Sequence, residues 1–185
     1  ELLRTELREP RSGLRRAQAI IITPADLAAP AQLDQIKSRI RPHNAAAPIF
    51  FAEHVHTGLR GVDDPPASAP SHSIDELSRR PFYAMAGIGN PQSLRRQLDR
   101  FSPMFKGFRA FEDHHVYSAA DVSDIEQAAR AAGAELLITT EKDWVKLIGK
   151  TAGIRLPILR LELQISFQAS GGEQLLKTIL PRLHR

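Results

Sequence analysis

Apolar residues in this chain form two kinds of pattern: short runs and longer segments with helical spacing. The runs at residues 19–23, 82–86 and 135–139 are largely apolar on both faces, as in strands buried within a parallel sheet. Between the runs, apolar residues recur every three or four positions and predict helices, for example over residues 33–40 and 94–101. This alternation of strands and helices indicates an α/β fold with a mostly parallel sheet.

Several predicted helices have recognisable end signals. Asn90 is a good N-cap, and Pro91 suits the first helical position. Ser118 followed by Asp121 is a capping box for the next helix, and Gly133 is a suitable residue to follow its last turn. The inner face of that helix is expected to carry Val122, Ile125, Ala129 and Ala132.

Two further strands and a last helix follow from the pattern. Residues 158–167 alternate strictly between apolar and polar, which predicts a strand with one buried face, and a helix with apolar residues over 175–180 follows. Residues 48–56 read as extended, with His54 and His56 on one face. That pair could ligate a metal, but solvated strand residues are the more common explanation.

The stretch from Gly61 to Arg80 has a different composition. It is rich in Pro, Ser and Asp and has few apolar residues, so it is expected to be a mobile loop that separates two units.

Composition narrows the classes of function. The 185 residues carry a net charge of +4, which suits an anionic partner without requiring one. There is no cysteine, so disulfides and thiolate zinc sites are excluded, and no apolar run reaches the length of a membrane span. The sequence shows neither an initiator Met nor a signal peptide pattern, and we expect it to start inside a longer protein.

The strongest candidate chemistry lies in residues 111–117. Asp113 is followed by two imidazoles, His114 and His115, between a predicted strand and a helix start. Histidine titrates near neutrality, and a neighbouring carboxylate can orient or charge it, so proton transfer is possible here. The cluster could equally be a capped, solvated strand end.

Two other segments are weaker candidates for phosphate chemistry. Residues 87–91 resemble a dinucleotide fingerprint, but the third glycine is missing because Gln92 stands there, so a tight turn before a capped helix is favoured. Arg8 and Glu9 could bind a phosphate and a magnesium ion, or form a salt-bridged helix start. No Gly-x-x-x-x-Gly-Lys-Ser/Thr loop for ATP phosphates is present.

Taken in order, four motifs resemble one family. These are Leu-Arg-Glu-Pro at 7–10 with an Ile-rich strand, Ala-Gly-Ile-Gly-Asn-Pro at 86–91, Phe-x-Asp-His-His-x-Tyr at 111–117 and Thr-Thr-Glu-Lys-Asp at 139–143. The set is similar to the C-terminal portion of tetraacyldisaccharide 4'-kinase, the lipid A 4'-kinase family, without its P-loop.

The resemblance implies transfer of the ATP γ-phosphate, with Mg2+, to the 4'-hydroxyl of tetraacyldisaccharide 1-phosphate in lipopolysaccharide assembly. It implies a glycolipid substrate, peripheral attachment to the cytoplasmic face of the bacterial inner membrane, and no nucleic-acid partner. It also implies three parts: the end of a P-loop-type nucleotide domain (1–46), a linker strand and mobile loop (47–80), and a small α/β C-terminal domain (81–185).

The family resemblance also implies roles for individual residues. His114 would pair with an aspartate of the missing N-terminal P-loop domain to activate the sugar hydroxyl, and Asp113 would orient His114. Arg8 would lie near the ATP phosphates and Glu9 near the magnesium. The role of residues 139–143 stays open.

Two alternatives belong to other classes. A non-catalytic α/β binding module without a nucleotide site would share the same core, and upstream sequence with a P-loop lysine would argue against it. A Rossmann-like oxidoreductase would need a third glycine and a ribose-binding acid, which are missing at the expected places. On the kinase interpretation, the chain alone is expected to be inactive.

Overall fold

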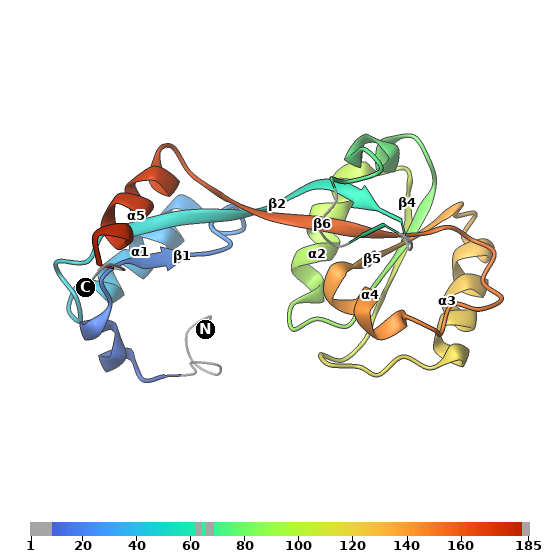
Figure 1. The fold of residues 1–185 in the computed structure, drawn as a ribbon, viewed down its shortest axis with the longest axis horizontal. Helices are drawn as coiled ribbons and strands as arrows, with labels where there is room; N and C mark the ends of the chain where they lie inside the picture. Colours follow the sequence, from blue (N-terminus) through green and yellow to red (C-terminus); the bar gives the residue numbers. More distant parts are fainter. Residues whose placement is uncertain (1–8, 62–63, 66–68, 183–185) are drawn as a thin grey trace. The chain divides into compact units, whose positions relative to one another are not determined.

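The chain forms two compact units in the computed structural model, which describes residues 9–61, 64–65 and 69–182 (Figure 1). The first unit consists of Glu1–Val55 and Ile165–Arg185, and the second of His56–Gln164. Strands β2 (Ile49–Arg60) and β6 (Ile158–Phe167) contribute to both units. The strands of the described residues follow the order β1-β2-β6-β5-β3-β4, and the predicted α/β class is confirmed.

The first unit is built around a short parallel pair. Strand β1 (Ile20–Ile22) pairs with the start of β2, so that Ile20 faces Ile49 across the ladder. Helix α1 (Pro30–Ile40) begins with a proline at a position where the missing amide hydrogen costs nothing. Helix α5 (Gly171–Ile179) and two 3-10 helices, Arg11–Arg16 and Leu180–Arg182, complete the unit.

The second unit contains the predicted parallel sheet. Strand β3 (Phe82–Ala86) pairs in parallel with β4 (Phe105–Ala110) on one side and with β5 (Leu136–Thr140) on the other. Strand β5 in turn pairs in parallel with β6. Short helical connections between the strands are α2 (Pro91–Leu98), α3 (Ala119–Ala131) and α4 (Glu141–Leu147).

Helices cover both faces of this sheet, which explains why its strands are apolar on both faces. Alternate residues of β3, such as Ala84, pack in a cluster with Leu94 and Leu98 of α2. Met85, between them, joins a second cluster formed with Ile125 of α3 and with α4. Burial on two faces removes the polar alternation that a half-exposed strand would show.

The predicted helix ends are largely confirmed. The Asn90 side chain accepts a hydrogen bond from the Ser93 amide at 3.0 Å, and Ser118 and Asp121 form the capping box. Gly133 follows α3 with φ of 74°, a left-handed conformation that glycine adopts without strain. The prediction for Ala132 is wrong, because it is exposed beyond the last turn of α3.

Strand β6 differs from the prediction of one buried face. Its first half is buried on both faces, including Arg160, whose guanidinium pairs with Glu141 at 3.1 Å and donates to the Asp64 carbonyl at 2.6 Å. In its second half, Leu163 and Ile165 are 49% and 58% exposed. The alternating pattern therefore predicted the strand correctly, but it did not predict which parts of the strand are buried.

The segment from Gly61 to Arg80 is more structured than the predicted mobile loop. Its described part contains a 3-10 helix, Ile74–Ser78, capped by Ser73, and an antiparallel bridge between Leu59 and His72. Leu77 is fully buried and packs into the α2-side cluster of the second unit. Leu77, together with the partly buried Ile74, therefore anchors a stretch whose overall composition resembles a linker.

The unit boundaries at Val55 and Gln164 differ from the predicted domain limits at 46 and 80. The structure groups the last 21 residues with the first 55, whereas the sequence division placed residues 81–185 together. The assignment of these parts to a nucleotide domain, a linker and a small domain stays a prediction. Within the described residues, no helix combines the length and apolar character needed to cross a bilayer.

Candidate active site

Three of the four sequence motifs meet at one edge of the second unit's sheet. Residues 87–90 follow β3, residues 111–117 follow β4, and α4 follows β5. Because these strands are parallel, their carboxyl ends lie at the same edge, which is where open α/β sheets place their sites. The fold thus joins segments that are far apart in the sequence.

Asp143 connects two of these segments. Its carboxylate is fully buried and accepts hydrogen bonds from the Gly87 amide at 3.0 Å and from the Thr140 hydroxyl at 2.8 Å. Thr140 is also the N-cap of α4, since its side chain accepts from the Asp143 amide at 3.1 Å. The motif at 139–143, whose role the sequence left open, therefore holds the start of α4 against the loop after β3.

Lys146 and Tyr117 complete this buried contact. The Lys146 ammonium lies 3.1 Å from Asp143 Oδ1 and 3.4 Å from the Gly87 carbonyl oxygen. Burial raises the pKa of Tyr117, and the nearby Asp143 carboxylate raises it further. A Cβ at Gly87 would lie 3.1 Å from the Tyr117 hydroxyl and 3.3 Å from Asp143, so the close approach of these groups depends on glycine. Sequence reasoning assigned no role to either residue, although Tyr117 ends the motif at 111–117 and Lys146 lies three residues beyond the motif at 139–143.

The proposed catalytic pair lies at the surface of the same edge. Asp113 Oδ1 accepts from the Lys142 ammonium at 2.9 Å and from the His114 amide at 3.0 Å. Asp113 Oδ2 lies 3.6 Å from His114 Nε2. The bond from Lys142 holds the pKa of Asp113 below its usual range, so the carboxylate stays ionised beside the imidazole.

The two histidines have different environments. His114 has a left-handed backbone with φ of 65°, and its side chain is 80% exposed. His115 instead stacks on Phe111 with ring centroids 4.5 Å apart, and its Nε2 lies 3.3 Å from Asp121 Oδ2. His114 is therefore free to meet a ligand, whereas His115 helps to tie the loop to α3.

The glycine-containing turn at 87–90 has the geometry of a capped helix start. The Asn90 side chain accepts a hydrogen bond from the Ser93 amide of α2. A Cβ at Gly89 would lie 3.3 Å from Asp113 Oδ2. The glycines thus permit close packing against the loop that carries Asp113. This matches the interpretation of a tight turn before a capped helix, which the sequence favoured over a dinucleotide fingerprint.

Of the phosphate and metal residues proposed from the sequence, the structure describes only Glu9, which lies in the first unit. Arg8 is outside the described residues, and Glu9 is exposed and forms an ion pair with Arg16. No group of three or more His, Asp or Glu side chains in the described residues is placed to hold a metal ion. One carboxylate with an arginine partner does not make a magnesium site by itself, so no reaction step is derived through the metal.

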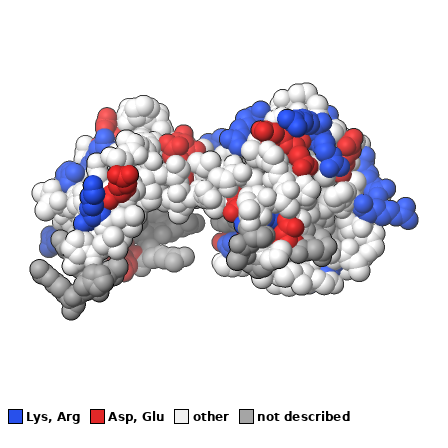
Figure 2. Space-filling view, turned by 45° about the horizontal axis from the view of Figure 1, so that its top comes forward, with Lys and Arg blue, Asp and Glu red and all other residues white. Residues whose placement is uncertain are grey.

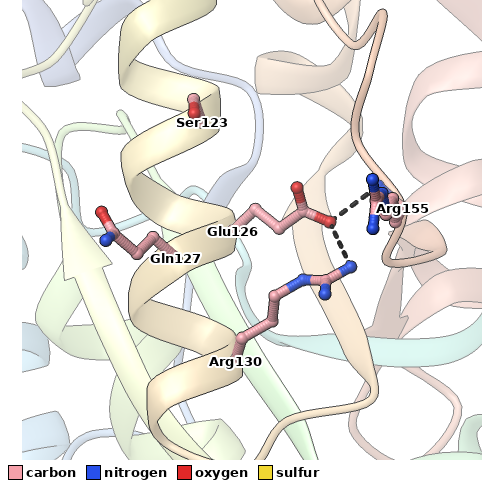
Figure 3. Close-up of a pocket in the computed structure, with 5 residues that line it drawn as sticks. All are labelled: Ser123, Glu126, Gln127, Arg130 and Arg155. Atoms are coloured by element: carbon pink, nitrogen blue, oxygen red, sulfur yellow. Dashed lines mark hydrogen bonds and ion pairs between the residues drawn. The ribbon is translucent and has the colours of Figure 1, made fainter.

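The second unit also contains a hollow of about 390 Å³, formed by α3 and the turn before β6 (Figure 3). Glu126 accepts from the main-chain amides of Arg155 and Leu156 at 2.7 and 2.9 Å and from Arg130 at 3.1 Å. Burial alone would raise the pKa of Glu126, but these bonds lower it. Since one oxygen of this carboxylate, Oε1, takes all three bonds and ties α3 to the turn before β6, we interpret the hollow as a structural contact.

Comparison with known proteins points to one family. The family model described as tetraacyldisaccharide-1-P 4'-kinase matches residues 4–181. Tetraacyldisaccharide 4'-kinase of Anaeromyxobacter dehalogenans (strain 2CP-C) is 32% identical over 161 residues, covering 85% of this chain and 41% of that protein. The enzyme of that name from Desulfatibacillum aliphaticivorans is 35% identical over 180 residues, 94% of this chain and 46% of that protein.

A solved structure gives the same result. The "apo" form of LpxK from Aquifex aeolicus in complex with ATP superposes with a TM-score of 0.58 at 25% identity, covering 95% of this chain and 45% of that one. The chain thus spans less than half the length of these relatives. Because the family model covers nearly all of it, the chain belongs to the tetraacyldisaccharide-1-P 4'-kinase family.

Proposed function

We propose that the complete protein carrying this chain transfers the γ-phosphate of ATP to the 4'-hydroxyl of tetraacyldisaccharide 1-phosphate, a step of lipid A biosynthesis. The observation that carries the proposal is the exposed His114 beside the ionised Asp113, in a chain whose family model covers residues 4–181. The ATP in the related Aquifex structure supports ATP as the donor.

In this reaction His114 acts as the base for the attacking hydroxyl. Its Nε2 is turned toward Asp113, so Nδ1 is the nitrogen available to take the proton. The 4'-oxygen forms the new bond to the γ-phosphorus while the bond from that phosphorus to the ADP oxygen breaks. The Asp113 carboxylate stabilises the imidazolium that results. Such a positioned base suits phosphoryl transfer, which depends mainly on orientation and charge stabilisation.

Other components of the reaction lie outside this sequence or its described residues. The printed chain has no Walker-type loop, so the ATP phosphates would be bound by residues beyond it, with Arg8 nearby. Glu9 is proposed as one magnesium ligand, and further ligands would have to come from elsewhere. We also propose peripheral attachment to the cytoplasmic face of the inner membrane, where the glycolipid substrate is found.

A non-catalytic binding module is the second candidate, favoured by the absence of a phosphate-binding loop from the printed sequence. Incubation of the complete protein with γ-labelled ATP and tetraacyldisaccharide 1-phosphate separates the two. The proposal expects label on the glycolipid at its 4' position. A folded protein that binds the glycolipid but transfers no label would contradict the kinase and support the binding module.

A further inference from the structure

We propose that Lys142 is a positioning residue for the reaction: its ammonium fixes the Asp113 carboxylate, which in turn orients His114. This inference rests on the proposed function, since it assigns a role within that reaction. It also gives the Lys of the motif at 139–143 a task distinct from that of its neighbour Asp143, which is buried and structural.

The two oxygens of Asp113 have different partners. Oδ1 accepts from Lys142 Nζ at 2.9 Å and from the His114 amide at 3.0 Å. Oδ2 makes no protein hydrogen bond in the described residues and faces His114 Nε2 at 3.6 Å. With one oxygen held by two donors, the carboxylate cannot rotate freely, and the other oxygen stays directed toward the imidazole.

The backbone that carries Lys142 is itself held on both sides. Asp143, the next residue, accepts from the Gly87 amide at 3.0 Å within the buried contact. Glu141, the preceding residue, pairs with the buried Arg160 at 3.1 Å. The first turn of α4 therefore has little freedom, and the Lys142 ammonium is presented to Asp113 from a fixed base. Such support is what a reacting pair needs to keep its geometry.

The exposure of this ion pair argues for a geometric role over a stabilising one. The Lys142 and Asp113 side chains are 48% and 39% exposed, and ion pairs this accessible contribute little to folding. The charged or titratable side chains that face Asp113 are Lys142 and His114, and Lys142 has the larger effect in keeping the carboxylate ionised. Its loss should leave the fold intact and let Asp113 titrate at a higher pH.

The test compares Lys142→Met, Lys142→Arg, Asp113→Asn and the Lys142→Met/Asp113→Asn double variant in the complete protein. We expect Lys142→Met to lower kcat about tenfold, the effect of losing one charge-assisted hydrogen bond, without raising KM for ATP. Lys142→Arg should restore most of the rate, because a guanidinium can make the same pair. The double variant should be no slower than Asp113→Asn alone. Lys150→Met, beyond the end of α4, is the matched control and should retain full activity.

Asp113 itself provides a readout that does not depend on turnover. Carbon-13 NMR should show its carboxyl titrating at higher pH in Lys142→Met than in the wild type. Wild-type kcat in Lys142→Met, or a double variant slowed by the product of the single effects, would overturn the inference. So would a rate loss that follows a lower melting temperature while Asp113 titrates unchanged. A wild-type protein without kinase activity would overturn the proposed function instead, and the inference with it.

Discussion

His114 and His115 are adjacent in sequence but differ in every contact that the structure gives them. His114 lies in the left-handed region and is exposed beside Asp113. His115 packs against Phe111 and Tyr117, with ring centroids 4.5 and 5.0 Å away. The sequence identified the pair as candidate chemistry, but only the fold distinguishes the exposed imidazole from the packed one.

These surroundings predict opposite effects for two alanine substitutions. In the complete protein, His114→Ala should lower kcat by about 10²–10⁴-fold, the usual contribution of a positioned base, with little change in melting temperature. His115→Ala should mainly destabilise the fold, by about 1 kcal/mol, through the lost aromatic contacts. Steady-state kinetics and thermal melts of both variants provide the check. A reversed pattern would move the role of base to His115.

Asp143 is the residue at this edge on which the most buried contacts depend. Asp143→Ala would leave the Gly87 amide without its acceptor and the Lys146 ammonium without its carboxylate partner, and we expect a loss of about 3 kcal/mol in the free energy of unfolding. Asp143→Asn, which keeps one acceptor oxygen, should cost less. Urea denaturation measures both, with the exposed Asp124→Asn as the control. Equal stability of Asp143→Ala and the control would contradict the assigned role.

At the scale of elements, the sequence correctly predicted those features that depend only on residues close together in the chain. The cap at Asn90 and the capping box at Ser118 depend on residues within three positions, and both are present. The burial of the parallel strands could also be predicted, because a strand that is covered on both faces does not alternate between apolar and polar residues. The short helix around Leu77 was missed, since its stability comes from tertiary packing and not from its own composition.

The site was predictable to a similar extent. The motifs themselves could be recognised, and parallel strands bring the ends of β3, β4 and β5 to one edge. The pairing of Lys142 with Asp113, 29 positions away, could not be inferred, because it depends on the register between strands and on the direction of one long side chain. The role of Asp143 was hidden for the same reason.

The contact between α3 and the turn before β6 predicts a pH-dependent effect. Glu126→Gln should lower stability at neutral pH, because Oε1 of Glu126 accepts from two main-chain amides and Arg130, and an uncharged amide oxygen is a weaker acceptor than a carboxylate oxygen. The pKa of Glu126 is lowered in the folded state, so its contribution is complete above the usual value of 4.5 and is lost as the pH falls through the folded value. Unfolding curves of wild type and variant should therefore differ at pH 7, and the difference should shrink as the pH falls below 4.5. A difference that persists in acid would contradict this account.

At the scale of the whole molecule, the chain accounts for 41% of the Anaeromyxobacter relative. The family match extends over both units, but the printed sequence contains no loop that could cradle ATP phosphates. The basic side chains visible on the second unit in Figure 2 are interspersed with acidic ones, so charge alone provides no equivalent site on that face.

This predicts that residues 1–185 alone bind ATP negligibly. Isothermal calorimetry should give no measurable heat of binding for this chain at millimolar ATP, whereas the complete protein should bind it. Circular dichroism of the same sample would establish that the chain is folded. A micromolar ATP site on the folded chain would contradict the proposed distribution of the reaction between this portion and the rest of the protein.

Because the backbone of His114 is left-handed, selection for folding and selection for activity should favour different residues at this position. A side chain with a Cβ costs about 1–2 kcal/mol in this conformation, and glycine or asparagine avoids much of that cost. A randomised library sorted only for folded protein should therefore become enriched in glycine and asparagine at this position. The same library sorted for growth that depends on the enzyme should keep histidine. Sequencing the two pools would show whether evolution has retained an unfavourable backbone here for the sake of the imidazole.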